Sequence, residues 1–234
     1  MDRLIKTAVI AGTPVDTQMG VEYIERKTQE AGIEPGFLPL YCPAALDCDE
    51  QVKFQYSDND EKRAVMDNIF DPAIEEGVRD FFIYCNSLSG SFDFDRYALL
   101  KSLDSGVDIN IYTPLQVYRR LGREYSRIGV MAANNLSAHA IEEALMASNP
   151  DIYMIGTGNM AIVRAIEDGL SSEEIADRCG LAHLMKYIEA CGAEALVLGC
   201  THFPYIQEEL EKLTCLPIID PAGEMFRALV EATR

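Results

Sequence analysis

The chain has 234 residues and carries 38 acidic and 20 basic side chains, so its formal net charge is −18. Nucleic acids and anionic membrane surfaces are therefore unexpected partners, because binding to phosphate groups needs clustered Lys and Arg side chains. With 48% hydrophobic residues the chain can bury a core, and its length suits one large domain or two small ones.

No stretch approaches the roughly 20 apolar residues of a membrane span. The apolar run near residue 10 is too short for a secretory signal, and seven cysteines without a CxxC pair indicate reduced thiols. We therefore expect a cytoplasmic protein.

Short runs rich in Val, Ile and Phe alternate with amphipathic stretches of helical period. This alternation is typical of α/β folds, in which helices cover both faces of a parallel sheet and ligands bind beyond the carboxyl ends of the strands. In chain order the expected elements are strand 7–11, helix 17–31, strand 36–40, helix 61–76, strands 80–85 and 108–112, helix 113–125, strand 128–132, helix 137–147, strand 152–155, helices 161–168 and 172–190, strand 195–199, helix 206–213, strand 216–219 and helix 222–232.

Residues 41–60 show no clear period, so we expect an irregular segment there, either a functional lid or a solvated excursion.

A short pattern recurs at about half the chain length. Residues 77–85 read Gly-Val-Arg-Asp-Phe-Phe-Ile-Tyr-Cys, and residues 192–200 read Gly-Ala-Glu-Ala-Leu-Val-Leu-Gly-Cys, at an offset of 115 residues. A looser pair, residues 8–13 and 129–134, is 121 residues apart. Both offsets are close to half the chain, so we expect a duplication that forms two domains. The first would comprise 1–113 plus 215–234 and carry Cys85, and the second would comprise 114–214 and carry Cys200.

The recurring pattern places Cys85 and Cys200 at equivalent strand ends. If the halves face each other about a pseudo-twofold axis, these two thiols meet across a cleft, each where backbone N–H groups and a helix dipole favour a thiolate. A cysteine at a strand end is more often part of the core. The polar residues that follow, Asn86-Ser87 and Thr201-His202, favour a functional role for this pair. The core interpretation is kept for Cys42, Cys48, Cys179, Cys191 and Cys215.

These motifs resemble those of the aspartate/glutamate racemase superfamily. Tyr-Cys-Asn-Ser-Leu-Ser-Gly around Cys85 is similar to its first cysteine motif, and Leu-Gly-Cys-Thr-His-Phe-Pro around Cys200 is similar to its second. Residues 11–24 fit the family's first substrate loop, and residues 161–170 place Glu167 where glutamate racemases carry an acidic residue beside the second cysteine. The resemblance covers nearly the whole chain. It implies two three-layer α/β domains with the active site in the cleft between them.

The resemblance implies cofactor-independent racemisation of an amino acid, without PLP and without a metal. One thiolate removes the α-proton, and the other thiol returns a proton from the opposite face. Such a two-base mechanism needs an acid and a base on opposite sides of one carbon, which two equivalent half-sites supply. By the family pattern, Cys85 acts on the D-enantiomer and Cys200 on the L-enantiomer. The expected substrate is aspartate, glutamate or both.

Further roles follow from the same resemblance. His202 and Glu167 would assist catalysis on the side of Cys200. Asp16 is a weaker candidate, because Gly12-Thr13-Pro14 follows the first strand, as in aspartate racemases, in place of the Asp-Ser-Gly of glutamate racemases. Residues 131–135 depart from the family's threonine-rich loop, which leaves the substrate open. The substrate's carboxylate and amine would be held by Thr13, Asn86, Ser87, Asn134 and Thr201.

An acidic substrate requires a local cation, because a chain of net charge −18 repels a dianion within a screening length of about 8–10 Å. Lys53 and Arg164 are the candidates. The expected partner is a small amino acid, and a homodimer is one candidate for the oligomeric state.

Other activities stay open at this point. They are a hydantoin racemase, a maleate cis-trans isomerase with a nucleophilic thiol, and a ligand-binding relative without turnover. An arylmalonate decarboxylase is disfavoured because it needs only the second cysteine, and a metal site built from Cys85, Cys200 and His202 explains the symmetry less well.

Overall fold

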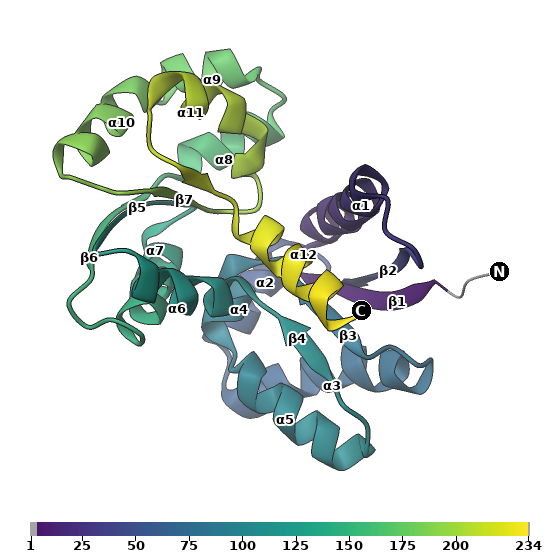
Figure 1. The fold of residues 1–234 in the computed structure, drawn as a ribbon. Helices are drawn as coiled ribbons and strands as arrows, with labels where there is room; N and C mark the ends of the chain where they lie inside the picture. Colours follow the sequence, from purple (N-terminus) through teal and green to yellow (C-terminus); the bar gives the residue numbers. More distant parts are fainter. Residues whose placement is uncertain (1–3, 234) are drawn as a thin grey trace. The chain divides into compact units, whose positions relative to one another are not determined.

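The computed structural model describes residues 4–233, which form two compact units. Unit 1 holds the described residues up to Pro114 and from Glu224 onward, and unit 2 holds Leu115–Gly223. Each unit is built on a four-stranded parallel sheet (Figure 1). The α/β fold with two parallel sheets, predicted from the alternation of strands and helices, is therefore confirmed.

Sheet A of unit 1 has the strand order β2-β1-β3-β4, and every pair in it is parallel. Its two central strands are almost wholly buried, as expected when helices cover both faces. The strands are β1 (Ile5–Ala11), β2 (Phe37–Pro43), β3 (Asp80–Ile83) and β4 (Asn110–Tyr112).

The register of sheet A shows which helices cover which face. Gly20 of α1 lies against Val9, and Phe70 of α3 stacks on Phe81 with ring centroids 4.0 Å apart. Val9 pairs with Phe82, so Val9 and Phe81 point to opposite faces, and α1 and α3 cover opposite sides of the sheet (Figure 1). The helices of unit 1 are α1 (Pro14–Ala31), α2 (Cys48–Tyr56), α3 (Asn59–Glu75), α4 (Asn86–Ser91), α5 (Phe94–Ser105) and most of α12 (Pro221–Ala232).

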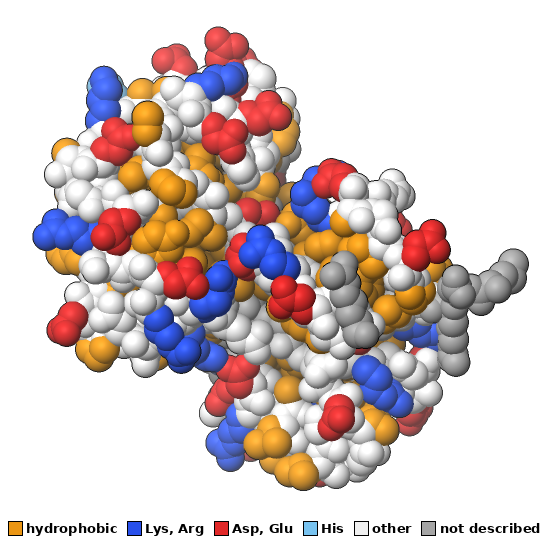
Figure 2. All heavy atoms as spheres, viewed as in Figure 1, with side chains coloured by type: hydrophobic (Ala, Val, Ile, Leu, Met, Phe, Trp, Pro, Cys, Tyr) orange, Lys and Arg blue, Asp and Glu red, His pale blue; other side chains and the backbone are white. Residues whose placement is uncertain are grey.

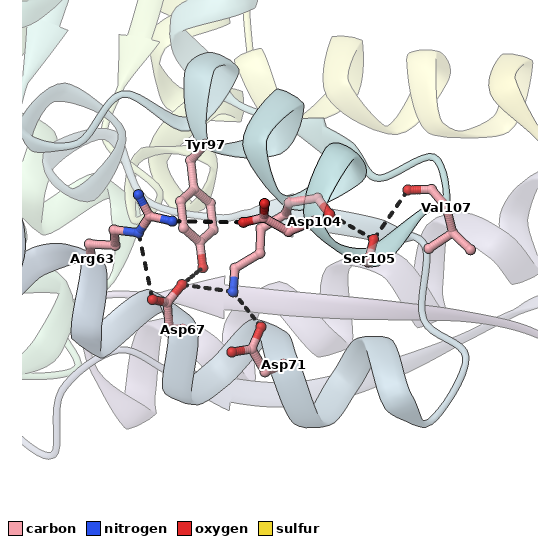
Figure 3. A network of polar contacts seen from close by, with 8 residues as sticks. Arg63, Asp67, Asp71, Tyr97, Asp104, Ser105 and Val107 are labelled. Atoms are coloured by element: carbon pink, nitrogen blue, oxygen red, sulfur yellow. Dashed lines mark hydrogen bonds and ion pairs between the residues drawn. The ribbon is translucent and has the colours of Figure 1, made fainter.

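A polar network joins α3 to α5 (Figure 3). The ammonium group of Lys101 on α5 lies 2.8 Å from Asp67 Oδ1 and also binds Asp71, both on α3. The Tyr97 hydroxyl donates to the same Asp67 oxygen at 2.7 Å. Arg63 contacts Asp67 and Asp104 at longer range. Lys101 is mostly buried, so these contacts fix the packing of α3 against α5.

Sheet B of unit 2 has the order β6-β5-β7-β8, which is the order of sheet A with each strand replaced by its counterpart in unit 2. Cys85 follows β3, and Cys200 follows β7, so both cysteines come after the third strand of their unit. This common topology agrees with the duplication expected from the sequence. The strands are β5 (Arg127–Ala132), β6 (Tyr153–Gly158), β7 (Leu196–Gly199) and β8 (Ile218–Ile219).

Helices also cover both faces of sheet B (Figure 1). Met131 and Leu198 pair across β5 and β7 and face a core formed with α8 to α11. On the opposite face, Gly199 packs against Ile141 of α7. The helices of unit 2 are most of α6 (Pro114–Glu124), α7 (Asn135–Met146), α8 (Met160–Glu167), α9 (Ser172–Arg178), α10 (Leu181–Ala190), the 3-10 turn η1 (Phe203–Ile206) and α11 (Gln207–Leu213).

The structure differs from the sequence expectations at four places. Residues 41–60 are mostly regular: β2 continues to Pro43, α2 follows, and α3 begins at Asn59. The expected helix 172–190 is two helices, because Gly180 has a positive φ of 65° between them. Residues 86–105 form α4 and α5, which the sequence reading left without structure. Residues 215–223, expected in the first domain, lie in unit 2 because β8 pairs with β7.

The surface is mixed in charge. Figure 2 shows acidic side chains spread over the drawn faces of both units, with lysines and arginines between them. Within residues 4–233, no helix combines the length and apolar character that a membrane crossing requires.

Candidate functional site

The predicted residues of unit 1 gather at the carboxyl edge of sheet A. Thr13 follows β1 as the N-cap of α1, and its hydroxyl accepts from the backbone N–H of Asp16 at 3.3 Å. Cys85 follows β3 as the N-cap of α4, and its sulfur accepts from the backbone N–H of Leu88 at 3.4 Å. Asn86 is buried in the first turn of α4, and Ser87 beside it is half-buried. The expected strand 80–85 ends at Ile83, so Cys85 belongs to the turn that starts the helix.

Cys85 is 5% exposed, and its surroundings set its protonation state. Burial and the Asp16 carboxylate raise the pKa of the Cys85 thiol to about 12, although the backbone N–H groups of Leu88, Gly12 and Ser87 act in the opposite direction. At neutral pH this cysteine of the free protein is therefore a thiol, ready to donate a proton.

Gln51 is a residue of this half-site that the sequence analysis missed. It lies on α2, and its side-chain nitrogen Nε2 donates to the Cys85 sulfur at 3.7 Å. The signal that could have placed it is the helix start: Asp47 caps the Glu50 N–H, and the Glu50 carboxylate accepts from the Leu46 N–H. A capped helix over residues 48–56 would have turned an irregular segment into a candidate part of the site.

In unit 2, an imidazole lies between a thiol and a carboxylate and is close to both. Cys200 follows β7, and its sulfur lies 3.6 Å from His202 Nδ1. His202 Nε2 lies 3.4 Å from Oε1 of Glu167, the last residue of α8. Cys200 and His202 are buried, whereas the Glu167 side chain is 52% exposed. The imidazole therefore lies within reach of the thiol through one ring nitrogen and of the carboxylate through the other.

The remaining predicted residues of unit 2 lie near the carboxyl ends of its strands. Thr201 is half-buried between Cys200 and His202. Asn134 follows β5 and caps α7, with its Oδ1 accepting from the Ser137 N–H at 2.8 Å. The oxygen of the Asn134 amide is thus engaged in the cap, and its NH₂ group is the part that suits a substrate carboxylate.

Tyr118 is a neighbour of Cys200 that the sequence analysis did not predict, and Asp220 acts on the same tyrosine. Tyr118 on α6 is completely buried, and burial together with the charges of Asp220 and Cys200 raises the pKa of its hydroxyl well above the usual value. Asp220 follows β8, and its Oδ1 accepts from the Ala222 N–H at 3.0 Å. Tyr118 therefore remains a neutral hydrogen-bond donor in the electrostatic neighbourhood of the second thiol.

Known proteins of similar sequence are glutamate racemases. The glutamate racemase of Limosilactobacillus reuteri (strain DSM 20016) is 28% identical over 163 residues, 68% of this chain and 58% of that relative. The glutamate racemase of Acidothermus cellulolyticus is 24% identical over 171 residues, 69% of this chain and 62% of the relative. The chain thus spans less than two thirds of the length of these relatives. No family model matches it.

Solved structures share the fold over almost the whole chain. Glutamate racemase from Francisella tularensis in complex with D-glutamate superposes with a TM-score of 0.69 at 19% identity, covering 99% of this chain and 81% of that one. Aspartate racemase from Picrophilus torridus gives a TM-score of 0.65 at 15% identity, covering 97% and 94%. In sequence and in fold the chain is therefore similar to the aspartate/glutamate racemase superfamily. The resemblance predicted from the two cysteine motifs is thereby confirmed.

The buried cations of the chain are not the ones that the sequence analysis proposed. Lys53 on α2 and Arg164 on α8 are both exposed. The buried cations among the described residues are Lys62 and Lys101, each 8% exposed, and Lys101 is paired within the network of Figure 3. Lys62 has no ion pair within residues 4–233 and shares the buried face of α3 with Met66 and Phe70. No group of three or more His, Cys, Asp or Glu residues in that range is arranged to hold a metal ion.

Proposed function

We propose that this protein is a cofactor-independent amino-acid racemase that acts on aspartate or glutamate. The observation that carries the proposal is the equivalence of Cys85 and Cys200, which follow the third strands of two sheets with the same strand order. The relatives named glutamate racemase and the structural neighbour named aspartate racemase support the substrate class.

The proposed reaction needs the two thiols to reach one α-carbon from opposite faces. A thiolate takes the α-proton, so that an S–H bond forms, the C–H bond breaks and its electron pair is delocalised into the substrate carboxylate. The opposite thiol then gives its proton to the carbon and becomes the thiolate. The product is the other enantiomer, and the protein is left with the charge on the other sulfur. No electron transfer takes place and no co-reactant is consumed.

The two half-sites prepare their thiols by different means. On one side, His202 Nδ1 lies beside the Cys200 sulfur and accepts its proton, and Glu167 contacts the other ring nitrogen. On the other, Cys85 rests as a thiol, and a substrate ammonium group beside it would favour the thiolate. Hydrogen-bond donors for the substrate carboxylates come from the hydroxyl, amide and backbone groups of Thr13, Asn86, Ser87, Asn134 and Thr201.

We propose that Lys62 binds the side-chain carboxylate of the substrate. α3 leads into β3 and runs back along the parallel sheet, so its first turn lies at the carboxyl edge, where Thr13 and Cys85 also lie. A mostly buried ammonium group without a protein carboxylate costs free energy that an anionic ligand offsets. A cation there overcomes the repulsion expected from the net charge of −18.

Incubation of single L-amino acids with the protein in heavy water tests the proposal. Aspartate or glutamate should gain deuterium at the α-carbon and yield the D-enantiomer without added cofactor, whereas alanine and leucine should not. Cys85→Ser and Cys200→Ser should each abolish racemisation, with circular dichroism as the control for folding. Absence of α-exchange with every amino acid would overturn the racemase. Full racemisation by either serine variant would overturn the two-thiol mechanism.

A further inference from the structure

The Cys85 sulfur is surrounded by N–H groups. The backbone N–H groups of Gly12, Ser87 and Leu88 hydrogen-bond to it, and Gln51 adds a side-chain amide. The backbone donors come from the turns after β1 and β3, so they are a consequence of the fold. Gln51 differs from them because it lies 34 residues away along the chain and reaches the sulfur by its side chain.

Gly12 makes room for Gln51. A Cβ atom at position 12 would lie 2.1 Å from Gln51 Nε2 and 2.3 Å from its Cδ, far inside any real contact. Gly12 is not among the glycines with positive φ, so its backbone conformation alone does not call for glycine. The close approach of the Gln51 amide does.

The orientation of α2 also directs Gln51 inward. Phe54, three residues on, is 5% exposed and anchors the same face of the helix, whereas Val52 and Lys53 are exposed. Gln51 itself is half-buried. The amide is therefore held against the sulfur by packing one turn away.

We propose that Gln51 is a positioning residue that stabilises the thiolate of Cys85 through its amide N–H. Gly12 permits this contact because it has no side chain that would displace the Gln51 amide. The inference rests on the proposed function for its catalytic meaning, because a racemase needs this thiolate when Cys85 is the base. Asp16 of unit 1 also acts on the sulfur, and its carboxylate disfavours the thiolate. A donor amide opposes that effect without adding a titratable group.

The direct test measures alkylation of Cys85 by iodoacetamide as a function of pH, with peptide mass spectrometry to separate it from the other cysteines. The folded-state pKa of Cys85 is about 12, so the rates are compared between pH 7 and 9, where the protein stays folded. The alkylation rate should fall about 3–10-fold in Gln51→Ala and in Gly12→Ala. Gln55→Ala, one turn along the same helix, is the matched control and should leave the rate unchanged. An unchanged rate in Gln51→Ala would overturn the inference, and the isotope effects described next separate a change in pKa from a change in access.

A second readout uses substrates deuterated at the α-carbon. Gln51→Ala should make proton transfer at Cys85 more rate-limiting. The primary isotope effect on kcat/KM should then grow for the enantiomer that Cys85 deprotonates, D by the family pattern, and shrink for the other. Isotope effects that change alike for both enantiomers would contradict the role of Gln51. Altered alkylation in a protein without racemisation would leave the role of Gln51 intact and defeat the proposed function.

Discussion

The imidazole of His202 lies 3.6 Å from the Cys200 sulfur through Nδ1 and 3.4 Å from Glu167 through Nε2. This thiol thus has an imidazole beside it, whereas Cys85 meets the amide of Gln51 and backbone N–H groups, with the Asp16 carboxylate acting on it as well. Cys85 and Cys200 follow equivalent strands, but the groups that surround their thiols are different.

Replacing Glu167 by Gln should lower kcat/KM about 10-fold, and His202→Asn should lower it about 100-fold, because the imidazole transfers the proton and the carboxylate acts through it. Racemisation followed by circular dichroism of the substrate measures both. Asp168→Asn, the next and likewise exposed acid, is the control and should match the unmodified protein. Equal rates for Glu167→Gln and Asp168→Asn would contradict the relay.

Cys85 should make the protein less stable at high pH. Its folded-state pKa of about 12 lies above that of a free thiol, so its contribution to stability is complete below pH ~8.5 and is lost as the pH rises toward 12. Between pH 7 and pH 10 the free energy of unfolding in urea should fall less in Cys85→Ser than in the unmodified protein, by about 1–2 kcal/mol. Cys215→Ser, at an exposed position, should lose as much as the unmodified protein. If Cys85→Ser did so too, the Cys85 thiol would not have the raised pKa.

Lys62 should affect the binding of acidic substrates more than turnover. Lys62→Met keeps the buried stem and removes the charge, so KM for aspartate or glutamate should rise about 10–100-fold while kcat changes less. Lys53→Met, at an exposed position on α2, is the matched control. A Lys62→Met variant with unchanged KM would remove this lysine from the substrate site.

The network of Figure 3 should act on stability without acting on catalysis. Lys101→Met leaves Asp67 without its closest cation and should lower the free energy of unfolding by about 1–2 kcal/mol, with kcat/KM unchanged. Urea unfolding and racemisation assays on the same variant separate the two effects. A fall in kcat/KM without a loss of stability would contradict a purely structural role.

The same network should respond to acid. Burial alone would raise the pKa of Asp67, but hydrogen bonds from Lys101 and Tyr97 hold it below the usual value. The contribution of Asp67 is therefore present above the unfolded pKa of about 3.9 and is lost as the pH falls through the lower folded value. In Asp67→Asn the acid-induced loss of stability should be shallower. An unchanged slope would contradict the lowered pKa.

Local patterns in the sequence were sufficient to predict the strand–helix alternation, the duplication and the equivalence of Cys85 and Cys200. Each of these depends on the spacing of residues along one segment, which can be taken directly from the sequence. The cysteine motifs also led to the superfamily whose members are similar to the chain in sequence and fold. His202 and Glu167, which the resemblance named together, lie 3.4 Å apart, and their roles stay predictions.

The contacts that complete each half-site lie beyond such patterns. α2 has nine residues and little amphipathic character, so its period was not visible, and Gln51 went unnoticed. The buried position of Lys62, the proximity of Tyr118 to Cys200 and the pairing of β8 with β7 join residues from separate elements. Packing in the folded chain brings such residues together. Local periodicity does not predict these contacts, because the free energy of burial depends on which surfaces meet in the folded chain.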